Sequence, residues 1–157
     1  MPQATSLPVM FHTIVVGTDF SECSQAAVDM ATKLALAAPD GRIFVVHTFE
    51  LPVYPTAEHT IDLFTPTQKA AQGQMDGCIA RLKQHGVQAQ GVVSAGSAWS
   101  CIGQTAEAQH ADLVVVGTHG RSGFQRALLG SVAEKVVRTS TVPVLTVRGQ
   151  PAEARSA

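Results

Sequence analysis

The sequence predicts an α/β fold in which helices cover both faces of a parallel sheet. Short apolar runs of strand length alternate with longer segments whose apolar residues recur every three or four positions. Five such strands and four such helices follow one another in strict alternation. Strands separated by helices favour right-handed crossovers, and these make neighbouring strands parallel.

The first part of the chain predicts two strands around one capped helix. Residues 13–17 form an apolar run, and Ser21 stands where a helix N-cap belongs. The helix that follows has an inward stripe of small and apolar side chains: Ala26, Ala27, Met30, Ala31, Leu34 and Ala35. Asp40-Gly41 breaks this pattern, and residues 42–47 form the second strand.

The middle of the chain predicts a loop, two helices and an edge strand. Residues 51–66 carry three prolines and no period, which indicates a loop with at most a short helical turn. A helix over 67–85 then ends at Gly86 as a C-cap. Residues 87–93 alternate between apolar and polar, as in a half-covered edge strand. The next helix opens at Ser97 or Ser100.

The last third carries the most informative pattern. Residues 112–116 read as a buried strand, followed by Gly117-Thr118-His119-Gly120, nine residues, and Gly130-Ser131. Ser131 is expected to cap a helix over 131–138, with Glu134 as its capping-box partner and Val132, Ala133, Val136 and Val137 inward. A final strand covers 142–147.

Glycines between a strand and a helix allow two interpretations. They let a ligand lie close to the backbone, and a helix N-terminus favours anions, which together predict a phosphate site. The alternative is a tight turn with no ligand. The segment is not a Walker A loop, because no Gly-Lys-Ser/Thr follows, and the chain has no G-x-G-x-x-G fingerprint.

Length and composition limit the classes of protein to which this chain can belong. The chain has 157 residues, which fits one domain, and 45% of them are hydrophobic against 15% charged, which excludes a disordered chain. A net charge of −1 gives no basic footprint, so we expect no nucleic-acid partner. The apolar runs are too short to span a membrane, and no signal peptide is recognisable. Three cysteines without CxxC spacing favour a reducing, cytoplasmic location.

The motifs resemble a known family. Gly-x-x-Gly, nine residues, Gly-Ser is similar to the ATP-binding signature of the universal stress protein family, and Val15-Val16-Gly17-Thr18-Asp19-Phe20-Ser21 resembles the family's first strand and Asp-Phe-Ser turn. The likeness covers residues 12–148. It implies that the strands, numbered in chain order, lie in the order 3-2-1-4-5. Ligands of such sheets bind where the order reverses, which is between strands 1 and 4.

The resemblance also implies roles for individual residues. Asp19, beside Thr18, is expected at the adenosine moiety, and Thr48 at the adenine through its backbone. The alternative for Asp19 is a plain acidic residue at the helix start. Gly117 is expected beside the ribose. The phosphates, with or without Mg²⁺, are expected to contact His119, Gly120, Arg121, Gly130, Ser131 and Val132. The alternative for His119 is an exposed loop histidine, and for Arg121 a solvated surface loop.

The expected function is that of an ATP-binding universal stress protein that acts as a nucleotide-dependent switch or sensor. Family members that resemble this chain commonly form homodimers, so we expect a homodimer that pairs its last strand, residues 142–147, with a second copy; the protein partner of the switch is unknown. No convincing general base accompanies the motif, so an efficient enzyme is not expected. A slow ATP hydrolase and a dimeric scaffold without nucleotide are the alternatives.

Overall fold

The computed structural model describes residues 10–50, 57–119 and 129–149, with side chains described from residue 66 onward in the segment that begins at 57. It contains one parallel sheet in the order β3-β2-β1-β4-β5. The strands are β1 (Thr13–Gly17), β2 (Arg42–Phe49), β3 (Gln88–Ala95), β4 (Leu113–Gly117) and β5 (Val144–Val147). The predicted fold class and strand order are confirmed.

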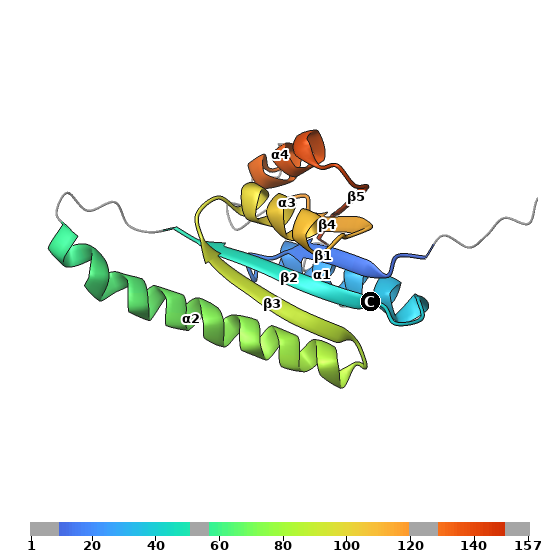
Figure 1. Ribbon diagram of the computed structural model, residues 1–157, viewed down its shortest axis with the longest axis horizontal. Helices are drawn as coiled ribbons and strands as arrows, with labels where there is room; N and C mark the ends of the chain where they lie inside the picture. Colours follow the sequence, from blue (N-terminus) through green and yellow to red (C-terminus); the bar gives the residue numbers. More distant parts are fainter. Residues whose placement is uncertain (1–9, 51–56, 120–128, 150–157) are drawn as a thin grey trace, which may run out of the picture.

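Four helices cover the two faces of the sheet (Figure 1). They are α1 (Glu22–Ala37), α2 (Ala57–Gln84), α3 (Ala98–Ala108) and α4 (Ser131–Thr139). Helices α1 and α2 pack on one face over a core that includes Ile14 and Met75, and α3 and α4 pack on the other over a core that includes Val15 and Ile102. None of the described helices is both long enough and apolar enough to cross a membrane.

The capping prediction for α1 is confirmed. Ser21 is the N-cap, and its hydroxyl accepts a hydrogen bond from the Ser24 N–H at 3.2 Å. The predicted C-cap of α2 also stands, because Gly86 has a φ of 83°, a conformation that residues with a side chain rarely adopt. These two signals depend on neighbouring residues only, which is why the sequence shows them.

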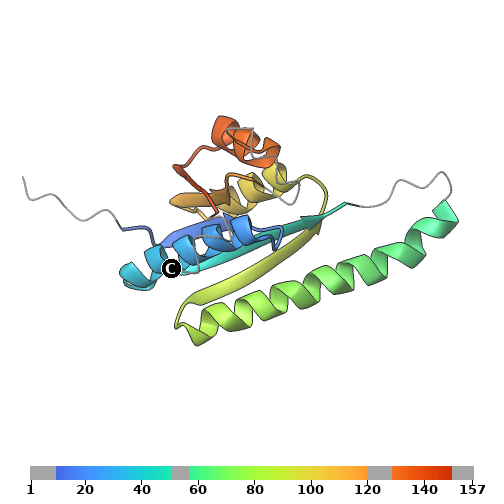
Figure 2. The ribbon, with the colours of Figure 1, turned by 180° about the vertical axis from the view of Figure 1, so that it is seen from behind.

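The predicted loop over 51–66 is wrong where the structure describes it. Helix α2 begins at Ala57, ten residues before the predicted start, and includes Pro66. Proline lacks an N–H and therefore removes one hydrogen bond, which weakens a helix without always ending it. In a helix of 28 residues the remaining bonds are retained, and its amino end reaches past the sheet (Figure 2).

The capping prediction for α4 is also wrong. Gly130 occupies the N-cap, Ser131 is the first helical residue, and no side chain caps this end. Two of the four valine and alanine side chains expected inward face outward: Val132 is 39% exposed and Val137 is 48% exposed. The helix is short and lies near the edge strand β5, so only a narrow face, with Ala133 and Val136, reaches the core.

Candidate functional site

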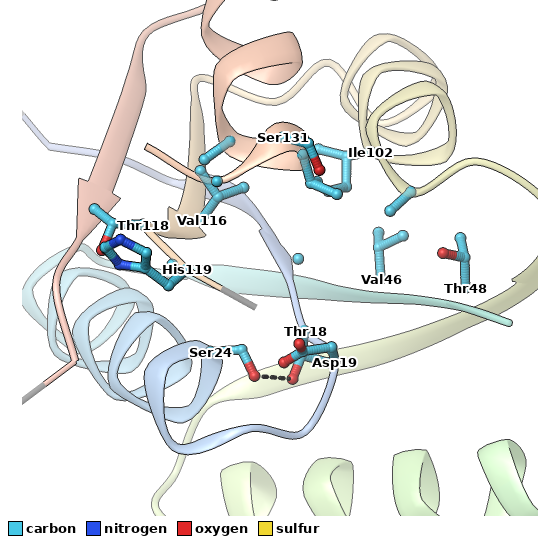
Figure 3. A pocket seen from close by; sticks show the side chains of 16 residues that line it. Thr18, Asp19, Ser24, Val46, Thr48, Ile102, Val116, Thr118, His119 and Ser131 are labelled. Atoms are coloured by element: carbon cyan, nitrogen blue, oxygen red, sulfur yellow. Dashed lines mark hydrogen bonds between the residues drawn. The ribbon is translucent and has the colours of Figure 1, made fainter. Parts of the chain in front are cut away.

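A cleft opens at the carboxyl ends of β1 and β4, where the strand order reverses (Figure 3). Its volume is about 260 Å³, just below the range of about 300–1,000 Å³ that is usual for small-molecule sites. The walls come from the β1–α1 loop, the end of β2, the start of α3, the end of β4 and the start of α4. Segments far apart in the chain therefore meet here, as expected for a ligand site in a doubly wound sheet.

Thr18 holds the β1–α1 loop in place. Its N–H donates to the carbonyl oxygen of Val46 at 2.9 Å, and its hydroxyl lies 3.0 Å from that of Ser24 (Figure 3). The same hydroxyl accepts from the N–H of Phe20 at 3.0 Å. Phe20 has a φ of 60°, which is costly for an aromatic residue. The loop is thus tied to β2 and α1 by backbone and buried side-chain bonds.

Asp19 and Thr48 form the polar rim of the cleft on the β1 and β2 side. Oδ1 of Asp19 accepts from the Ser21 N–H at 3.0 Å, which is the role that the alternative interpretation gave this residue. The same carboxylate lines the cleft, so the two roles are compatible. Thr48 is the last residue but one of β2, which ends at Phe49.

The end of β4 supplies the opposite wall. Thr118 is buried, its N–H donates to the Val147 carbonyl oxygen at 2.9 Å, and its hydroxyl lies 3.0 Å from Nδ1 of His119. At Gly117, an added Cβ would lie 3.2 Å from the carbonyl oxygen of Cys23. This glycine therefore serves the close packing of β4 against the start of α1, whatever it does for a ligand.

The amino end of α4 opens on the cleft. The N–H of Gly130 donates to the Thr118 carbonyl oxygen at 2.6 Å, which holds the helix start against the end of β4. The first N–H groups of a helix have no partner within it. Here they belong to Ser131, Val132 and Ala133, since the Glu134 N–H is the one that donates to the Gly130 carbonyl at 2.8 Å. Three N–H groups and the helix dipole make this end suitable for an anion.

The structure brings most of the predicted site residues together. Eight of them line the same cleft: Thr18, Asp19, Thr48, Gly117, His119, Gly130, Ser131 and Val132. Gly120 and Arg121 lie outside the described residues. The contacts predicted between these residues and a nucleotide remain predictions.

Other residues of the cleft were not predicted. Ser24, Val46, Ala98, Ile102, Val116 and Ala133 also line it. Most are small or apolar, so their types carry no chemical signal. Ala98 and Ile102 belong to α3, which tertiary packing against α4, β2 and β1 brings to the cleft. Thr118 also lines the cleft, and its place inside the glycine motif is the one feature of the sequence that could have predicted this.

The charges of the described cleft residues are few. Asp19 is the one carboxylate, His119 is the one titratable ring, and neither lysine nor arginine occurs among the described lining residues. Within the described ranges no three His, Cys, Asp or Glu side chains come together as a metal site.

Comparison with known proteins agrees with this geometry. Residues 10–148 match the Universal stress protein family. The chain is 33% identical over 148 residues to universal stress protein YxiE of Bacillus subtilis, a match that covers 88% of this chain and 100% of YxiE. The solved structure of MJ0577 from Methanocaldococcus jannaschii superposes with a TM-score of 0.82 at 25% identity, and the match covers 92% of this chain and 100% of that one.

A second solved structure, a universal stress protein in complex with cAMP, has a TM-score of 0.66 and 28% identity, covering 90% of this chain and 100% of that one. The fold and the cleft define a doubly wound α/β protein with an open cleft at its topological switch point. Within that class, the chain belongs to the universal stress protein family.

Proposed function

We propose that this protein binds an adenine nucleotide, ATP with Mg²⁺, in the cleft between β1 and β4, and acts as a nucleotide-dependent switch in a stress response. One observation carries the proposal: the uncapped amino end of α4 opens on the same cleft as Asp19 and Thr48. An anion-binding end and a polar rim on opposite walls suit a ligand with phosphates at one end and a nucleoside at the other.

Each wall has a defined task in this proposal. Asp19 accepts a hydrogen bond from a ribose hydroxyl or the adenine amino group, and the backbone of Thr48 contacts the base. Thr18 keeps the loop that carries Asp19 in place through its bonds to Val46 and Ser24. The relative that was solved with cAMP supports an adenine nucleotide as the ligand class.

The phosphates lie at the start of α4. The N–H groups of Ser131 and Val132 donate to phosphate oxygens, and the close contact of Gly130 with the Thr118 carbonyl oxygen keeps them in place. His119 contacts the phosphates from the end of β4, and the phosphates themselves coordinate Mg²⁺. Gly120 and Arg121 complete this end in the proposal.

A switch fits the described residues better than an efficient hydrolase. Among the described lining residues only Asp19 and His119 can accept a proton. Asp19 belongs to the adenosine end, and Nδ1 of His119 lies at hydrogen-bond distance from the Thr118 hydroxyl. Slow hydrolysis remains the second candidate, with His119 as the group nearest the phosphates.

The proposal includes a cytoplasmic homodimer. Strand β5 is the last in the sheet, and its four residues, Val144–Val147, are half-buried. Pairing this edge with a second copy would satisfy its outward N–H and C=O groups and cover apolar side chains. All three cysteines are free, in keeping with a reducing compartment.

The test is direct. The purified protein is denatured, any released nucleotide is identified by chromatography, and the emptied protein is titrated by calorimetry with ATP, cAMP and GTP, each with and without Mg²⁺. Stoichiometric adenine nucleotide, or saturable binding of ATP in preference to GTP, is the expected result. No nucleotide and no heat at millimolar ATP would refute the proposal.

A further inference from the structure

A second cleft lies on the other side of the β1–α1 loop, between that loop, the end of β2 and helix α2. Its volume is about 740 Å³, well within the range of ligand sites. It shares two residues, Asp19 and Thr48, with the cleft described above. Its remaining polar lining comes from His47, Glu50, Thr67 and Gln74.

The buried polar side chain among the described residues of this cleft is His47, which is 8% exposed. Its Nδ1 lies 2.9 Å from the carbonyl oxygen of Thr18, and a carbonyl can only accept, so Nδ1 carries the proton. In the neutral ring Nε2 then bears a lone pair. The Phe20 ring packs on the imidazole with a centroid distance of 4.5 Å, which holds this orientation.

Nε2 of His47 has no hydrogen-bond partner among the described residues. No described side-chain nitrogen or oxygen is both fully enclosed and unpartnered, so Nε2 must reach open space. Because His47 is more than nine-tenths buried and lines the second cleft, that space is the cleft. A hydrogen-bond acceptor therefore faces an open volume that nothing described here fills.

Among the described residues that line this cleft, the charged side chains are all acidic. Asp19 and Glu50 bring two carboxylates, and no lysine or arginine occurs among the described residues that line the cleft. A neutral imidazole and two carboxylates all accept hydrogen bonds, so a group with several N–H donors and a positive charge is complementary to them. The hydroxyl of Thr67 and the amide of Gln74 can accept as well.

From this combination we infer that the second cleft is a binding site for an alkylammonium group. The ammonium donates to Nε2 of His47 and to the Glu50 carboxylate, and its alkyl chain lies against Ala70 and Ala71 of α2. The group comes either from a small diamine or from a lysine side chain of another protein. Because Asp19 belongs to both clefts, the ammonium also changes nucleotide affinity, a coupling that rests on the proposed function and acts in both directions.

The probe is 1,4-diaminobutane, titrated into nucleotide-free protein at constant ionic strength while the imidazole ¹⁵N signals of His47 are followed by NMR. Tetramethylammonium is the matched control ligand, because it has the charge without an N–H donor. A saturable shift of the His47 signals with the diamine and none with tetramethylammonium is expected. Equal responses to both cations, or no response of His47, would overturn the inference.

Substitutions of Glu50 and His47 test whether these two side chains contact the ammonium group. Glu50→Gln should weaken diamine binding by about twofold to fivefold, as for an exposed ion pair, while Glu107→Gln on the exposed face of α3 removes the same charge elsewhere and should leave it unchanged. His47→Asn keeps a donor for the Thr18 carbonyl but removes the Nε2 acceptor, and should abolish binding. If Glu50→Gln and Glu107→Gln weaken binding equally, the cleft is not the site.

A second titration distinguishes the sources of the ammonium. Nα-acetyl-lysine amide that binds more tightly than the diamine indicates a protein side chain, and the reverse order indicates a small molecule. ATP affinity of Glu50→Gln is measured in parallel, because Glu50 does not line the nucleotide cleft. In the unaltered protein, ATP binding without diamine binding overturns this inference alone, whereas diamine binding without ATP binding refutes the proposed function alone.

Discussion

Gly130→Ala tests the phosphate end of the nucleotide cleft. Gly130 has ordinary extended backbone angles, φ −69° and ψ 159°, so an alanine there meets no conformational strain. Its Cβ would lie 3.0 Å from the carbonyl oxygen of Thr118, and this gap has to open towards the 3.4 Å at which ordinary contact begins. The 2.6 Å hydrogen bond from the Gly130 N–H to that same oxygen spans the gap and lengthens with it.

The consequence for binding follows from the position of this contact. The start of α4 moves away from β4, so at least one N–H of Ser131 or Val132 loses its alignment with a phosphate oxygen. One hydrogen bond to a charged group contributes about 1.5–3 kcal/mol, so ATP affinity should fall by about 10-fold to 100-fold. The free energy of unfolding should fall by only about 1 kcal/mol, because the core is untouched.

Calorimetric titration with ATP and urea denaturation of the same sample measure the two effects. Gly103→Ala in α3 is the matched control, since a Cβ there meets nothing within 4 Å. It should leave affinity unchanged and stabilise the helix by about 0.5–1 kcal/mol. A folded Gly130→Ala protein that binds ATP within twofold of the unaltered chain would refute the phosphate assignment.

Three further changes probe other parts of the fold. Gly86→Ala, at a φ of 83°, should lower the free energy of unfolding by about 1 kcal/mol in urea denaturation; an unchanged midpoint would contradict the left-handed C-cap. Burial raises the pKa of the Cys78 thiol above its ordinary value, against the opposing Arg81 guanidinium. The unfolded thiol therefore loses its proton first, so stability should fall as the pH rises past about 8.5, the ordinary thiol pKa, and by less in Cys78→Ala. Equal falls in both proteins would show that the thiol does not contribute. Thr146→Pro removes an N–H from the outer edge of β5, because the carbonyls of Pro143 and Val147 are those that face β4. Light scattering should then give a monomer where the unaltered chain gives a dimer; a dimer in both cases would exclude this edge as the interface.

The wrong predictions for the start of α2 and for the cap of α4 have a common cause. The residues of α2 before Thr67 were assigned to a loop because proline usually ends a helix, and Ser131 was assigned as a cap because serine usually caps one. Both rules describe local preference. The hydrogen bonds of a long helix outweigh one proline, and the bond from Gly130 to Thr118 sets the first turn of α4 one residue earlier than the side chains suggest.

Local chemistry alone determined the alternation of strands and helices, the cap at Ser21, the C-cap at Gly86 and the glycine motif at Gly117 and Gly130. These depend on residues close together in the chain, so their signals survive in a single sequence. The tertiary structure decided which segments meet at the first cleft, and that Ile102 of α3 lines it. It also decided that Nε2 of His47 faces the second cleft. These contacts arise because strands distant in sequence pair in parallel, so no pattern of neighbouring residues predicts them.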